Sequence, residues 1–250
     1  MNVLDIAEFY SSARGKVTQE LIARKLAMAL GARADQCVVG IGYAVPYLGL
    51  GSRNLAFMLA RSGVMRWPEE GAARSALVDE LDLPLGDNVA DVTLLIHSLE
   101  FAESAEDMLA EAWRILAPQG KLLLVVPNRS GLWSASEASP FGRGQPFSRS
   151  QISGLLKEAQ FSLTRIERTL VLPPWGPLGL ARAVEHAGHF GFGRFSGVIV
   201  VEARKQVFAY ATGKPARRAL PRLRPMLLHG PQPAGHAMSK GAEYRASAFL

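Results

Sequence analysis

Cysteine is almost missing from this chain of 250 residues, because Cys37 is the only one. A single cysteine cannot form a disulfide within the chain, and it cannot build a metal centre from several thiolates. His186 and His189 lie three residues apart, but no carboxylate or third histidine stands at metal-ligand spacing. The sequence therefore predicts no metal site, and Cys37 is expected to be a small buried hydrophobe.

Long uncharged stretches are also rare. The longest extends from Gln36 to Ser52 and contains Pro46 and four glycines, so it falls short of a membrane-spanning helix. Asp5 and Glu8 interrupt the apolar residues near the N-terminus, which argues against a signal peptide. These two absences favour a soluble, cytoplasmic protein.

Net positive charge is absent from most of the chain and concentrated at its C-terminal end. Residues 213–250 contain seven Lys or Arg and one Glu, which accounts for the whole formal net charge of +6. The same segment is rich in proline and has no apolar period, so a disordered tail is expected after a folded domain of residues 1–212. The tail weakly suggests an unspecific, salt-dependent contact with nucleic acid or an anionic membrane. The folded body is neutral and is not marked as a nucleic-acid binder.

Apolar segments with strand character alternate with amphipathic ones, which is typical of an α/β fold with a mostly parallel sheet. An N-terminal helix is expected in two pieces, residues 4–13 and 16–30, because Gly15 interrupts it. Ser104 and Ser148 are expected to be the N-caps of two later helices. Strands are expected at residues 38–41, 54–60, 75–78, 90–96, 121–126, 161–172 and 197–210, and further helices at 104–116, 151–159 and, as helix or loop, 181–193.

A glycine turn comes after the first expected strand. The apolar run that begins at Cys37 ends in Gly40 and Gly42, and small residues such as Ala44 come next, where a helix would start. A strand, a tight turn and a helix N-terminus in this order bring backbone N–H groups close to a nucleotide. Glycine turns after strands are common, so the weight of this pattern depends on the residues further along the chain.

Polar residues come at the ends of two later strands, where ligands bind in open α/β sheets. Asp79 and Glu80 come directly after the strand at 75–78, and His97 and Glu100 come after the strand at 90–96. Histidine titrates close to neutral pH, so His97 is a candidate general base or substrate contact, with Glu100 as a second catalytic candidate.

A long segment without apolar period, residues 127–148, comes after the fifth strand, and loops of this length are more often functional than idle. Asn128 and Arg129 are candidates for binding a carboxylate or phosphate of the substrate, because a guanidinium suits such groups. Trp133 and Phe141 are expected either to line an apolar substrate pocket or to pack as a lid.

Together these residues resemble a class I S-adenosylmethionine (SAM)-dependent methyltransferase of the type 11-like group, over residues 4–210. The most specific part is residues 83–128: a Leu-Pro turn, a strand running into His97, a helix, an Ala-Pro-x-Gly corner and a strand ending in Pro-Asn. The resemblance implies a three-layer α/β sandwich with a Rossmann-like, seven-stranded, mostly parallel sheet whose last strand is antiparallel. It also implies SAM as the cofactor.

The resemblance also implies roles for individual residues. Gly40, Gly42 and Ala44 hold the glycine-motif positions of the cofactor turn. Asp79 would accept a hydrogen bond from the adenine amino group, and the next residue, Glu80, would read the ring through its N–H. An aspartate at a strand end also commonly caps the next turn, so both interpretations of Asp79 stay open. By the same resemblance His97 would border the cofactor, and the N-terminal helices, residues 1–31, would cap its mouth and bring Tyr10 to the substrate.

The chain departs from the family at the two usual acidic cofactor contacts. Gly40 stands where the first strand usually carries an acid, and Ala44 and Pro46 stand where two further glycines are usual. No acidic residue occurs between Gln36 and Pro68, and Arg61 comes after the second strand where a carboxylate usually holds the ribose. Two lost hydrogen bonds to charged acceptors predict SAM binding weaker than usual by roughly 100-fold or more.

The sequence supports two functions from different classes. The first is a SAM-dependent methyltransferase that acts on a small or lipid-like acceptor, which Asp79, His97 and the long segment favour. The second is a non-catalytic protein with the methyltransferase fold that serves as a binding or regulatory partner of another protein, which the missing carboxylates favour.

Overall fold

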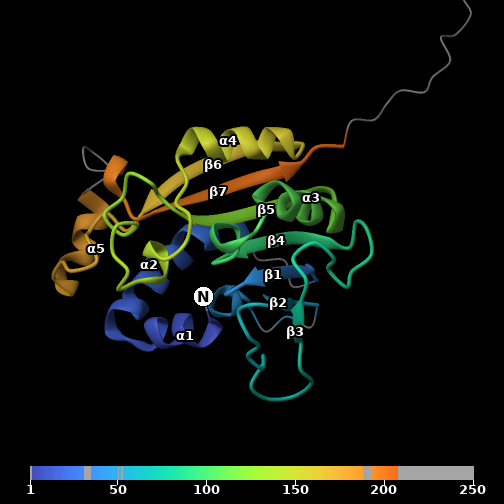
Figure 1. Cartoon of the computed structure of the whole chain (residues 1–250), viewed down its shortest axis with the longest axis horizontal. Coiled ribbons are helices and arrows are strands. Elements are labelled where there is room, and N and C mark those ends of the chain that lie inside the picture. The colour runs from blue at the N-terminus through green and yellow to red at the C-terminus, as the bar shows by residue number, and fades with distance from the viewer. Residues whose placement is uncertain (1, 31–34, 50, 52, 188–192, 208–250) are drawn as a thin grey trace, which may run out of the picture. The chain divides into compact units, whose positions relative to one another are not determined.

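Seven strands form one mixed sheet at the centre of the fold (Figure 1). The computed structural model describes residues 2–30, 35–49, 51, 53–187 and 193–207. In this part of the chain the strand order is β3-β2-β1-β4-β5-β7-β6. The strands are β1 (Val38–Gly42), β2 (Leu55–Leu59), β3 (Ser75–Val78), β4 (Ala90–Ile96), β5 (Leu116–Pro127), β6 (Phe161–Thr169) and β7 (Val198–Lys205).

Met1–Phe208 forms one compact unit, and residues 209–250 lie outside the described residues. The expected tail and the expected domain boundary at residue 212 therefore fall where no structure is described.

Strand β7 runs against its neighbours, because it pairs antiparallel with both β5 and β6. The pairs β1 with β2, β1 with β4, β2 with β3 and β4 with β5 are all parallel. This confirms the predicted mostly parallel sheet with an antiparallel last strand. The carboxyl ends of β1, β2, β3 and β4 consequently meet at one edge of the sheet, where Gly42 lies beside Ile96.

Helices cover both faces of the sheet and make the predicted three layers (Figure 1). α3 (Ala105–Ile115) and α4 (Arg149–Glu158) pack on one face, where Met108 and Ile152 join the same buried cluster as Val39. α2 (Ala13–Leu30) covers the other face, where Leu26 joins the cluster of Val38. Successive side chains of a strand point to opposite faces, so one apolar run of β1 serves both layers. α1 (Val3–Ser11) and α5 (Leu178–Ala187) lie beside α2.

Two serine caps fix the start of α3 and α4, as predicted. The side chain of Ser104 accepts a hydrogen bond from the N–H of Asp107 at 3.1 Å. Ser148 forms a capping box with Gln151, in which each side chain bonds the other residue's N–H. Short 3₁₀ turns connect other elements: η1 (Val45–Tyr47), η2 (Leu99–Phe101), η3 (Pro140–Gly142) and η5 (Gly193–Phe195).

The break between the first two helices is at Ser12, not at Gly15 as expected. Ser12 has extended backbone angles, and its hydroxyl accepts a hydrogen bond from the N–H of Gly15, so it ends α1 and caps α2. Gly15 lies inside α2, where a Cβ would approach the carbonyl oxygen of Phe9 to 2.0 Å and the Cα of Tyr10 to 2.5 Å. Glycine is needed at this position because the two helices touch, and not because the helix stops.

Several strand and helix ends differ from the predicted ones. β5 already begins at Leu116, because Ala90 of β4 pairs with it across a register shift at the Pro-x-Gly corner. β6 ends at Thr169 because Leu170 adopts a positive φ of 64°, which a strand does not accommodate. The segment at 181–193, expected as helix or loop, is helical as far as Ala187, because it overlaps α5, which begins three residues earlier at Leu178.

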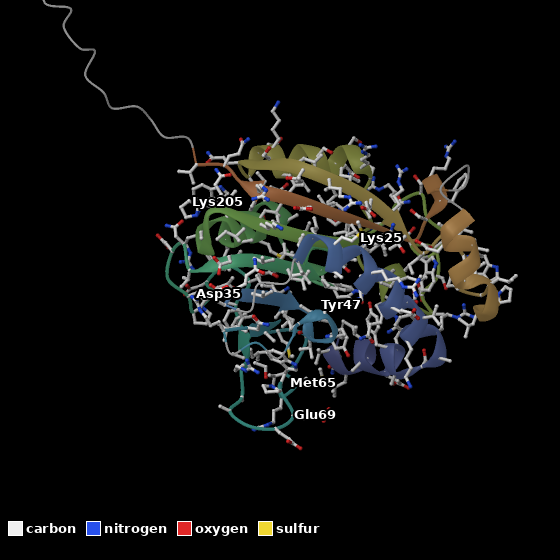
Figure 2. The ribbon with its side chains drawn as sticks, turned by 180° about the vertical axis from the view of Figure 1, so that it is seen from behind. Lys25, Asp35, Tyr47, Met65, Glu69 and Lys205 are labelled. Atoms are coloured by element: carbon white, nitrogen blue, oxygen red, sulfur yellow. The ribbon has the colours of Figure 1, made fainter. Side chains whose placement is uncertain are left out.

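Ion pairs and hydrogen bonds of lysine side chains connect the outer elements of the fold. Lys25 of α2 pairs with Glu167 of β6 at 2.9 Å. Lys205, at the end of β7, is buried and donates hydrogen bonds of 2.7 Å to Asn88 Oδ1 and to the carbonyl oxygen of Leu116. Figure 2 shows Lys205 at the end of the sheet away from Tyr47. Among the described helices, none is long and apolar enough to cross a membrane.

Candidate functional site

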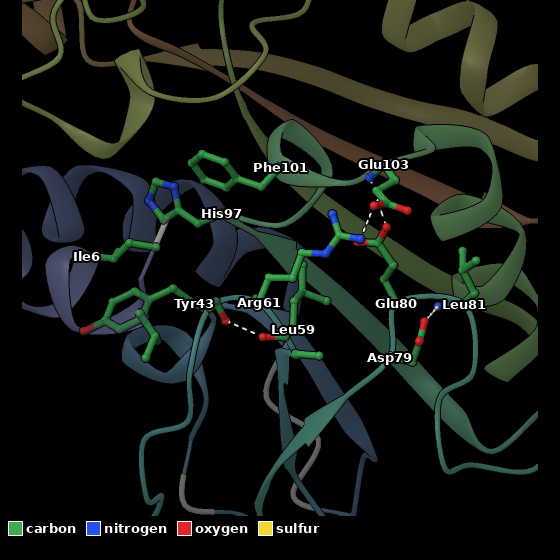
Figure 3. Close-up of a pocket in the computed structure, with 14 residues that line it drawn as sticks. Ile6, Tyr43, Leu59, Arg61, Asp79, Glu80, Leu81, His97, Phe101 and Glu103 are labelled. Carbon is green, nitrogen blue, oxygen red and sulfur yellow. Dashed lines mark hydrogen bonds and ion pairs between the residues drawn. The ribbon is translucent and has the colours of Figure 1, made fainter.

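A pocket of about 380 Å³ lies at the carboxyl ends of β1 to β4 (Figure 3). The carboxyl end of each strand contributes residues to its wall, among them Gly42 and Tyr43 at β1, Arg61 and Ser62 at β2, Asp79 and Glu80 at β3, and His97 and Phe101 at β4. Ligands of open α/β sheets bind at this edge, so the pocket is the candidate functional site.

Helix α1 forms the roof of this pocket. Val3 and Ile6, both buried, line it and pack against Tyr43 and Met58 in a small apolar cluster of their own. The helix is anchored by a backbone hydrogen bond of 2.6 Å from the N–H of Val3 to the carbonyl oxygen of Ser62, beyond β2. The roof therefore belongs to a part of the core that is separate from the two clusters on the faces of the sheet.

Gly42 is the member of the glycine turn that borders the pocket. It has a positive φ of 82°, and a Cβ there would lie 2.3 Å from the carbonyl oxygen of Ile96 and 2.7 Å from that of His97. The absence of a side chain thus lets β1 and β4 approach each other at their carboxyl ends.

Gly40 and Ala44 do not line the pocket described above. A Cβ on Gly40 would lie 2.6 Å from the Cβ of Ala44 and 3.0 Å from a methyl carbon of Leu48. The space next to Gly40 is therefore already filled by apolar atoms. A carboxylate at this position would have no room without moving η1.

Carboxylates line one part of the pocket wall. Asp79, Glu80 and Glu103 line the pocket together with a single guanidinium, that of Arg61, which forms an ion pair with Glu103 (Figure 3). Glu80 Oε1 accepts a hydrogen bond of 3.0 Å from the N–H of Glu103, and Asp79 Oδ1 accepts one of 3.0 Å from the N–H of Leu81. The turn-capping interpretation of Asp79 is thus realised, while its carboxylate also borders the pocket. The excess of carboxylates favours a cationic ligand.

Sequence reasoning missed Glu103. It comes seven residues after the end of β4 and belongs to no motif, so its position in the chain carries no signal beyond an acid before a helix N-cap. Only the packing of this segment against the end of β2 brings it to Arg61.

His97 lies in a chain of buried hydrogen bonds. Its Nε2 is 2.9 Å from the hydroxyl of Tyr10, and its Nδ1 is 3.1 Å from Oε1 of Glu100. The hydroxyl of Tyr47 donates to that of Tyr10 at 3.3 Å. The ring of Phe141 packs on the imidazole, with centroids 4.7 Å apart. The two predicted catalytic residues, His97 and Glu100, are therefore in contact.

The direction of these bonds is set by the phenols. Burial raises the pKa of Tyr10 and of Tyr47 well above the ordinary tyrosine value, so both hydroxyls keep their protons. Since Tyr47 donates to Tyr10, the proton of Tyr10 is free to bond Nε2 of His97, and Nδ1–H of His97 then donates to Glu100. Both ring nitrogens are engaged. Oε2 of Glu100 is buried without a hydrogen-bond partner among the described residues.

Two of the predicted substrate residues, Asn128 and Arg129, donate hydrogen bonds to backbone carbonyl oxygens. Asn128 Nδ2 donates to the carbonyl oxygens of Arg194 and Ser196 at 3.0 and 2.8 Å, which ties the end of β5 to the start of β7. Arg129 donates to the carbonyl oxygen of Pro146 at 3.1 Å. Both side chains bind backbone and lie outside the pocket lining.

The aromatic candidates are also packed. Trp133 Nε1 donates to the carbonyl oxygen of Leu172 at 2.7 Å, and its ring meets Phe141 edge-on at 5.9 Å. Phe141 and Tyr10 both contact His97, and Trp133 contacts Phe141. None of the three lines the pocket described above, and their contact with a substrate or their packing as a lid stays a prediction.

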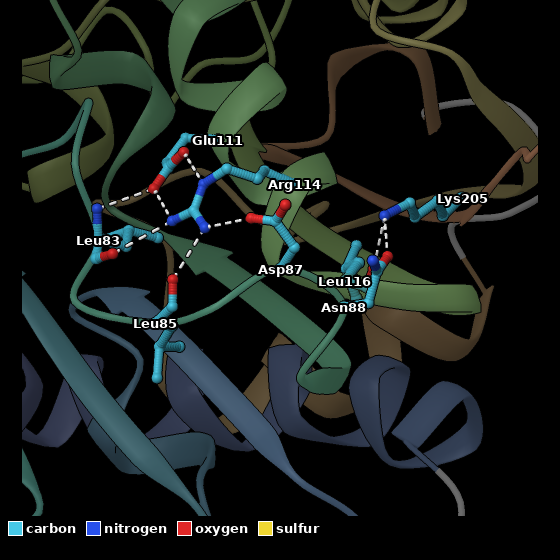
Figure 4. A network of polar contacts seen from close by, with 8 residues as sticks. All are labelled: Leu83, Leu85, Asp87, Asn88, Glu111, Arg114, Leu116 and Lys205. Carbon is cyan, nitrogen blue, oxygen red and sulfur yellow. Dashed lines mark hydrogen bonds and ion pairs between the residues drawn. The ribbon is translucent and has the colours of Figure 1, made fainter.

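A network centred on Arg114 fixes the loop that comes after Asp79 (Figure 4). Its guanidinium pairs with Glu111 at 2.6 Å and Asp87 at 2.7 Å, and donates to the carbonyl oxygens of Leu83 and Leu85. Its hydrogen bonds hold the pKa of Glu111 below the usual carboxyl range. The Leu-Pro turn noted in the sequence is thus clamped onto α3, which immobilises the wall next to the pocket.

Among the described residues, no three His, Cys, Asp or Glu side chains lie close enough together to hold a metal ion. His189 lies outside the described residues.

Residues 39–124 match the family profile described as a methyltransferase domain, a range that runs from β1 into β5. Over this range the chain is similar to methyltransferase domains, and its seven-stranded fold is shared with class I SAM-dependent methyltransferases. SAM is the cofactor that this likeness supports, as predicted from the sequence. No curated protein matches the chain.

Solved methyltransferases share the fold at low sequence identity. A SAM-dependent methyltransferase from Thermotoga maritima aligns with a TM-score of 0.54 and 19% identity, over 80% of this chain and 94% of its own. The partner of the Haloferax volcanii Trm112 methyltransferase activator, in the structure of their complex, aligns with a TM-score of 0.56 and 15% identity, over 80% and 97%. A geranyl diphosphate methyltransferase in complex with SAM aligns with a TM-score of 0.55 and 15% identity, over 77% and 86%. At these identities the likeness concerns the fold.

The residues of the pocket fit a SAM-type cofactor, although by a different set of groups than is usual for class I methyltransferases. The sulfonium and ammonium groups of SAM are cationic, and the pocket offers Asp79, Glu80 and Glu103 against one Arg61. The usual carboxylate beside Gly40 has no space here. The acids that line this pocket come instead from the ends of β3 and from the segment before α3.

Proposed function

We propose that the chain binds SAM in the pocket at the ends of β1 to β4 and directs its methyl group to a small or lipid-like acceptor. The observation that carries the proposal is a roofed pocket of about 380 Å³ with an excess of carboxylates at this edge of a methyltransferase sheet. When bound, SAM supplies an electrophilic methyl group whose departure leaves a neutral thioether.

The chain's own residues would bind and orient the cofactor. Asp79 would accept from the adenine amino group through its exposed carboxylate. Glu80 and Glu103, which also line the pocket, would accept from the ribose hydroxyls in place of the missing β2 acid. Arg61 would hold Glu103 in place through their ion pair. Backbone next to Gly42 would meet the methionine part.

Methyl transfer of this kind needs mainly alignment of donor and acceptor, and the roof of α1 supplies a way to exclude water. Val3 and Ile6 cover the pocket with apolar side chains. His97 has both ring nitrogens engaged by Tyr10 and Glu100, so in this arrangement it borders the pocket as a wall and not as a free base. An acceptor that loses its proton without a protein base suits this site.

The class of acceptor rests on analogy and on local apolar character. The apolar side chains of the pocket lining, among them Val3, Ile6 and Phe101, favour an acceptor with an apolar part. The geranyl diphosphate methyltransferase of similar fold gives an example of such an acceptor on this architecture.

The alternative, a non-catalytic partner protein, is favoured by two observations. Both ring nitrogens of His97 are engaged, and the space beside Gly40 is filled by apolar atoms. A structurally similar chain is the partner of an activator protein, so binding of a second protein is compatible with the fold. A contact of the basic tail with nucleic acid or an anionic membrane stays a prediction.

Calorimetric titration with SAM and with its demethylated product, S-adenosylhomocysteine, tests the proposal. Glu103→Gln should weaken binding by roughly 10-fold or more, because a hydrogen bond to a charged acceptor is lost. Glu106→Gln is the matched control, since Glu106 lies three residues further along the chain, in the first turn of α3, and does not line this pocket. Submicromolar binding by the parent would show that the pocket acids replace the missing ones.

Two other outcomes would contradict parts of the proposal. If the parent gives no heat and no thermal shift at millimolar SAM, the enzyme interpretation is abandoned in favour of the partner protein. If SAM binds but Glu103→Gln and Glu106→Gln behave alike, the proposed cofactor contacts are wrong although the fold still binds its cofactor.

A further inference from the structure

Tyr10 of the roof helix reaches the pocket wall through His97. We propose that Tyr10 is a positioning residue: its hydroxyl holds His97 in the tautomer with the proton on Nδ1, and so keeps Nε2 committed to the roof instead of to a ligand. The meaning of this arrangement for methyl transfer rests on the proposed function, whereas the tautomer itself does not. Docking of α1 and the hydrogen-bonding state of His97 are thereby coupled.

The geometry around the imidazole defines one pattern of donors. Glu100 Oε1 lies 3.1 Å from Nδ1, and a carboxylate oxygen can only accept there if the proton sits on Nδ1. Tyr10 lies 2.9 Å from Nε2, which then accepts from the phenol. His97 and Glu100 have fully buried side chains, so water does not compete for these bonds.

Packing leaves the ring little freedom. His97 has a positive φ of 49°, a backbone conformation that is uncommon for residues other than glycine. Phe141 lies against the imidazole at 4.7 Å, and the ring of Tyr10 lies at 5.7 Å in an edge orientation. With the ring held between these two aromatic side chains, the hydrogen bonds at its two nitrogens decide its tautomer.

Tyr10 and Glu100 belong to different elements of the fold, so their roles can be tested separately. Glu100 comes three residues after His97, in η2, so it belongs to the same strand end. Tyr10 comes from α1, 87 residues away in the chain, and among the described residues it is the group bonded to Nε2. Tyr47 is bonded to the phenol of Tyr10 and not to the ring, which places it one step further from His97.

Three substitutions test this order. Tyr10→Phe removes the donor to Nε2 and keeps the aromatic packing. Tyr47→Phe makes the same chemical change at a neighbouring buried tyrosine and is the matched control. Glu100→Gln replaces the acceptor at Nδ1 by an amide that can also donate, which frees the tautomer from the other side.

The measurement is ¹⁵N–¹H spectroscopy of the histidine rings in the full chain without ligand, with the signal of His97 assigned by its loss in His97→Gln. The parent should show a single tautomer protonated on Nδ1. Tyr10→Phe and Glu100→Gln should each convert it to an averaged pattern, while Tyr47→Phe should leave it as in the parent. A parent protonated on Nε2, an unchanged spectrum in Tyr10→Phe, or equal changes in Tyr10→Phe and Tyr47→Phe would each overturn the proposal.

A second readout connects the tautomer with the pocket. The same ring spectra, recorded with S-adenosylhomocysteine bound after a calorimetric titration, show whether the tautomer is kept when the pocket is filled. The bound parent and bound Tyr47→Phe should keep the single tautomer protonated on Nδ1, and bound Tyr10→Phe should keep the averaged pattern. If the parent does not bind the ligand, the proposed function fails while the spectra still decide the role of Tyr10. If it binds and the spectra of Tyr10→Phe are parental, the role of Tyr10 fails while the function stands.

Discussion

Replacing Gly42 by alanine should destabilise the fold before it affects any ligand. Glycine at this turn is usually explained by close approach to a cofactor, but the nearest atoms to an added Cβ belong to β4 and the residues after it. They are the carbonyl oxygens of Ile96 at 2.3 Å and His97 at 2.7 Å, and the Cβ of Ser98 at 2.9 Å. Two of the three are backbone atoms, so no side-chain rotation relieves the contact.

The magnitude is the sum of two terms. A side chain at a positive φ of 82° costs about 1–2 kcal/mol relative to glycine. Forcing atoms into a packed region costs about 1–3 kcal/mol more. Gly42→Ala should therefore lose about 2–5 kcal/mol of unfolding free energy. For a folded unit of this size that corresponds to a fall in melting temperature of roughly 5–15 °C.

The assay is urea unfolding followed by circular dichroism, together with a thermal melt. Gly154→Ala is the control, because Gly154 lies within α4 and no atom lies within 4 Å of the added Cβ. That variant should gain about 0.5–1 kcal/mol from helix propensity. If Gly42→Ala unfolds at the parental midpoint and loses only SAM affinity, the role of Gly42 lies in cofactor approach and the packing argument is refuted.

Two further predictions concern stability. Arg114 lowers the folded-state pKa of Glu111, so this pair stabilises the fold above the ordinary carboxyl pKa, and the stabilisation is lost as pH falls through the lowered value. Urea midpoints of the parent should therefore decrease between neutral pH and about pH 3 more steeply than those of Glu111→Gln; equal slopes would contradict the role of Arg114. Deleting residues 213–250 should leave the melting temperature nearly unchanged, since the segment has charge but no apolar period; a loss of several degrees would mean that the tail docks on the domain.

Local sequence was enough to predict the fold class and most of its elements. The apolar runs of β1 and β4, the serine caps of α3 and α4, and the Leu-Pro turn each depend on neighbours within a few residues. Strand–helix alternation then restricts the topology, because parallel strands need crossover connections. Asp79 and His97 could be assigned to the pocket edge for the same reason, since each comes directly after a strand.

Contacts between distant segments could not be predicted in this way. Glu103 meets Arg61, and Tyr10 meets His97, only because separate elements pack at one edge of the sheet. Those contacts also change what a substitution at a predicted site residue would test. His97→Ala, the obvious test of a catalytic base, would leave the buried hydroxyl of Tyr10 and the carboxylate of Glu100 without a partner, so it tests stability as well as chemistry.

The sequence by itself determined an α/β methyltransferase fold whose first strand lacks its usual acid, because backbone periodicity and turn chemistry are local properties. Tertiary structure decided that Leu48 and Ala44 occupy the space beside Gly40, and that Phe141 packs between Trp133 and His97 instead of lining the pocket. The physical reason is that a side chain's surroundings depend on every element that packs against it, and close packing allows only one occupant for each space.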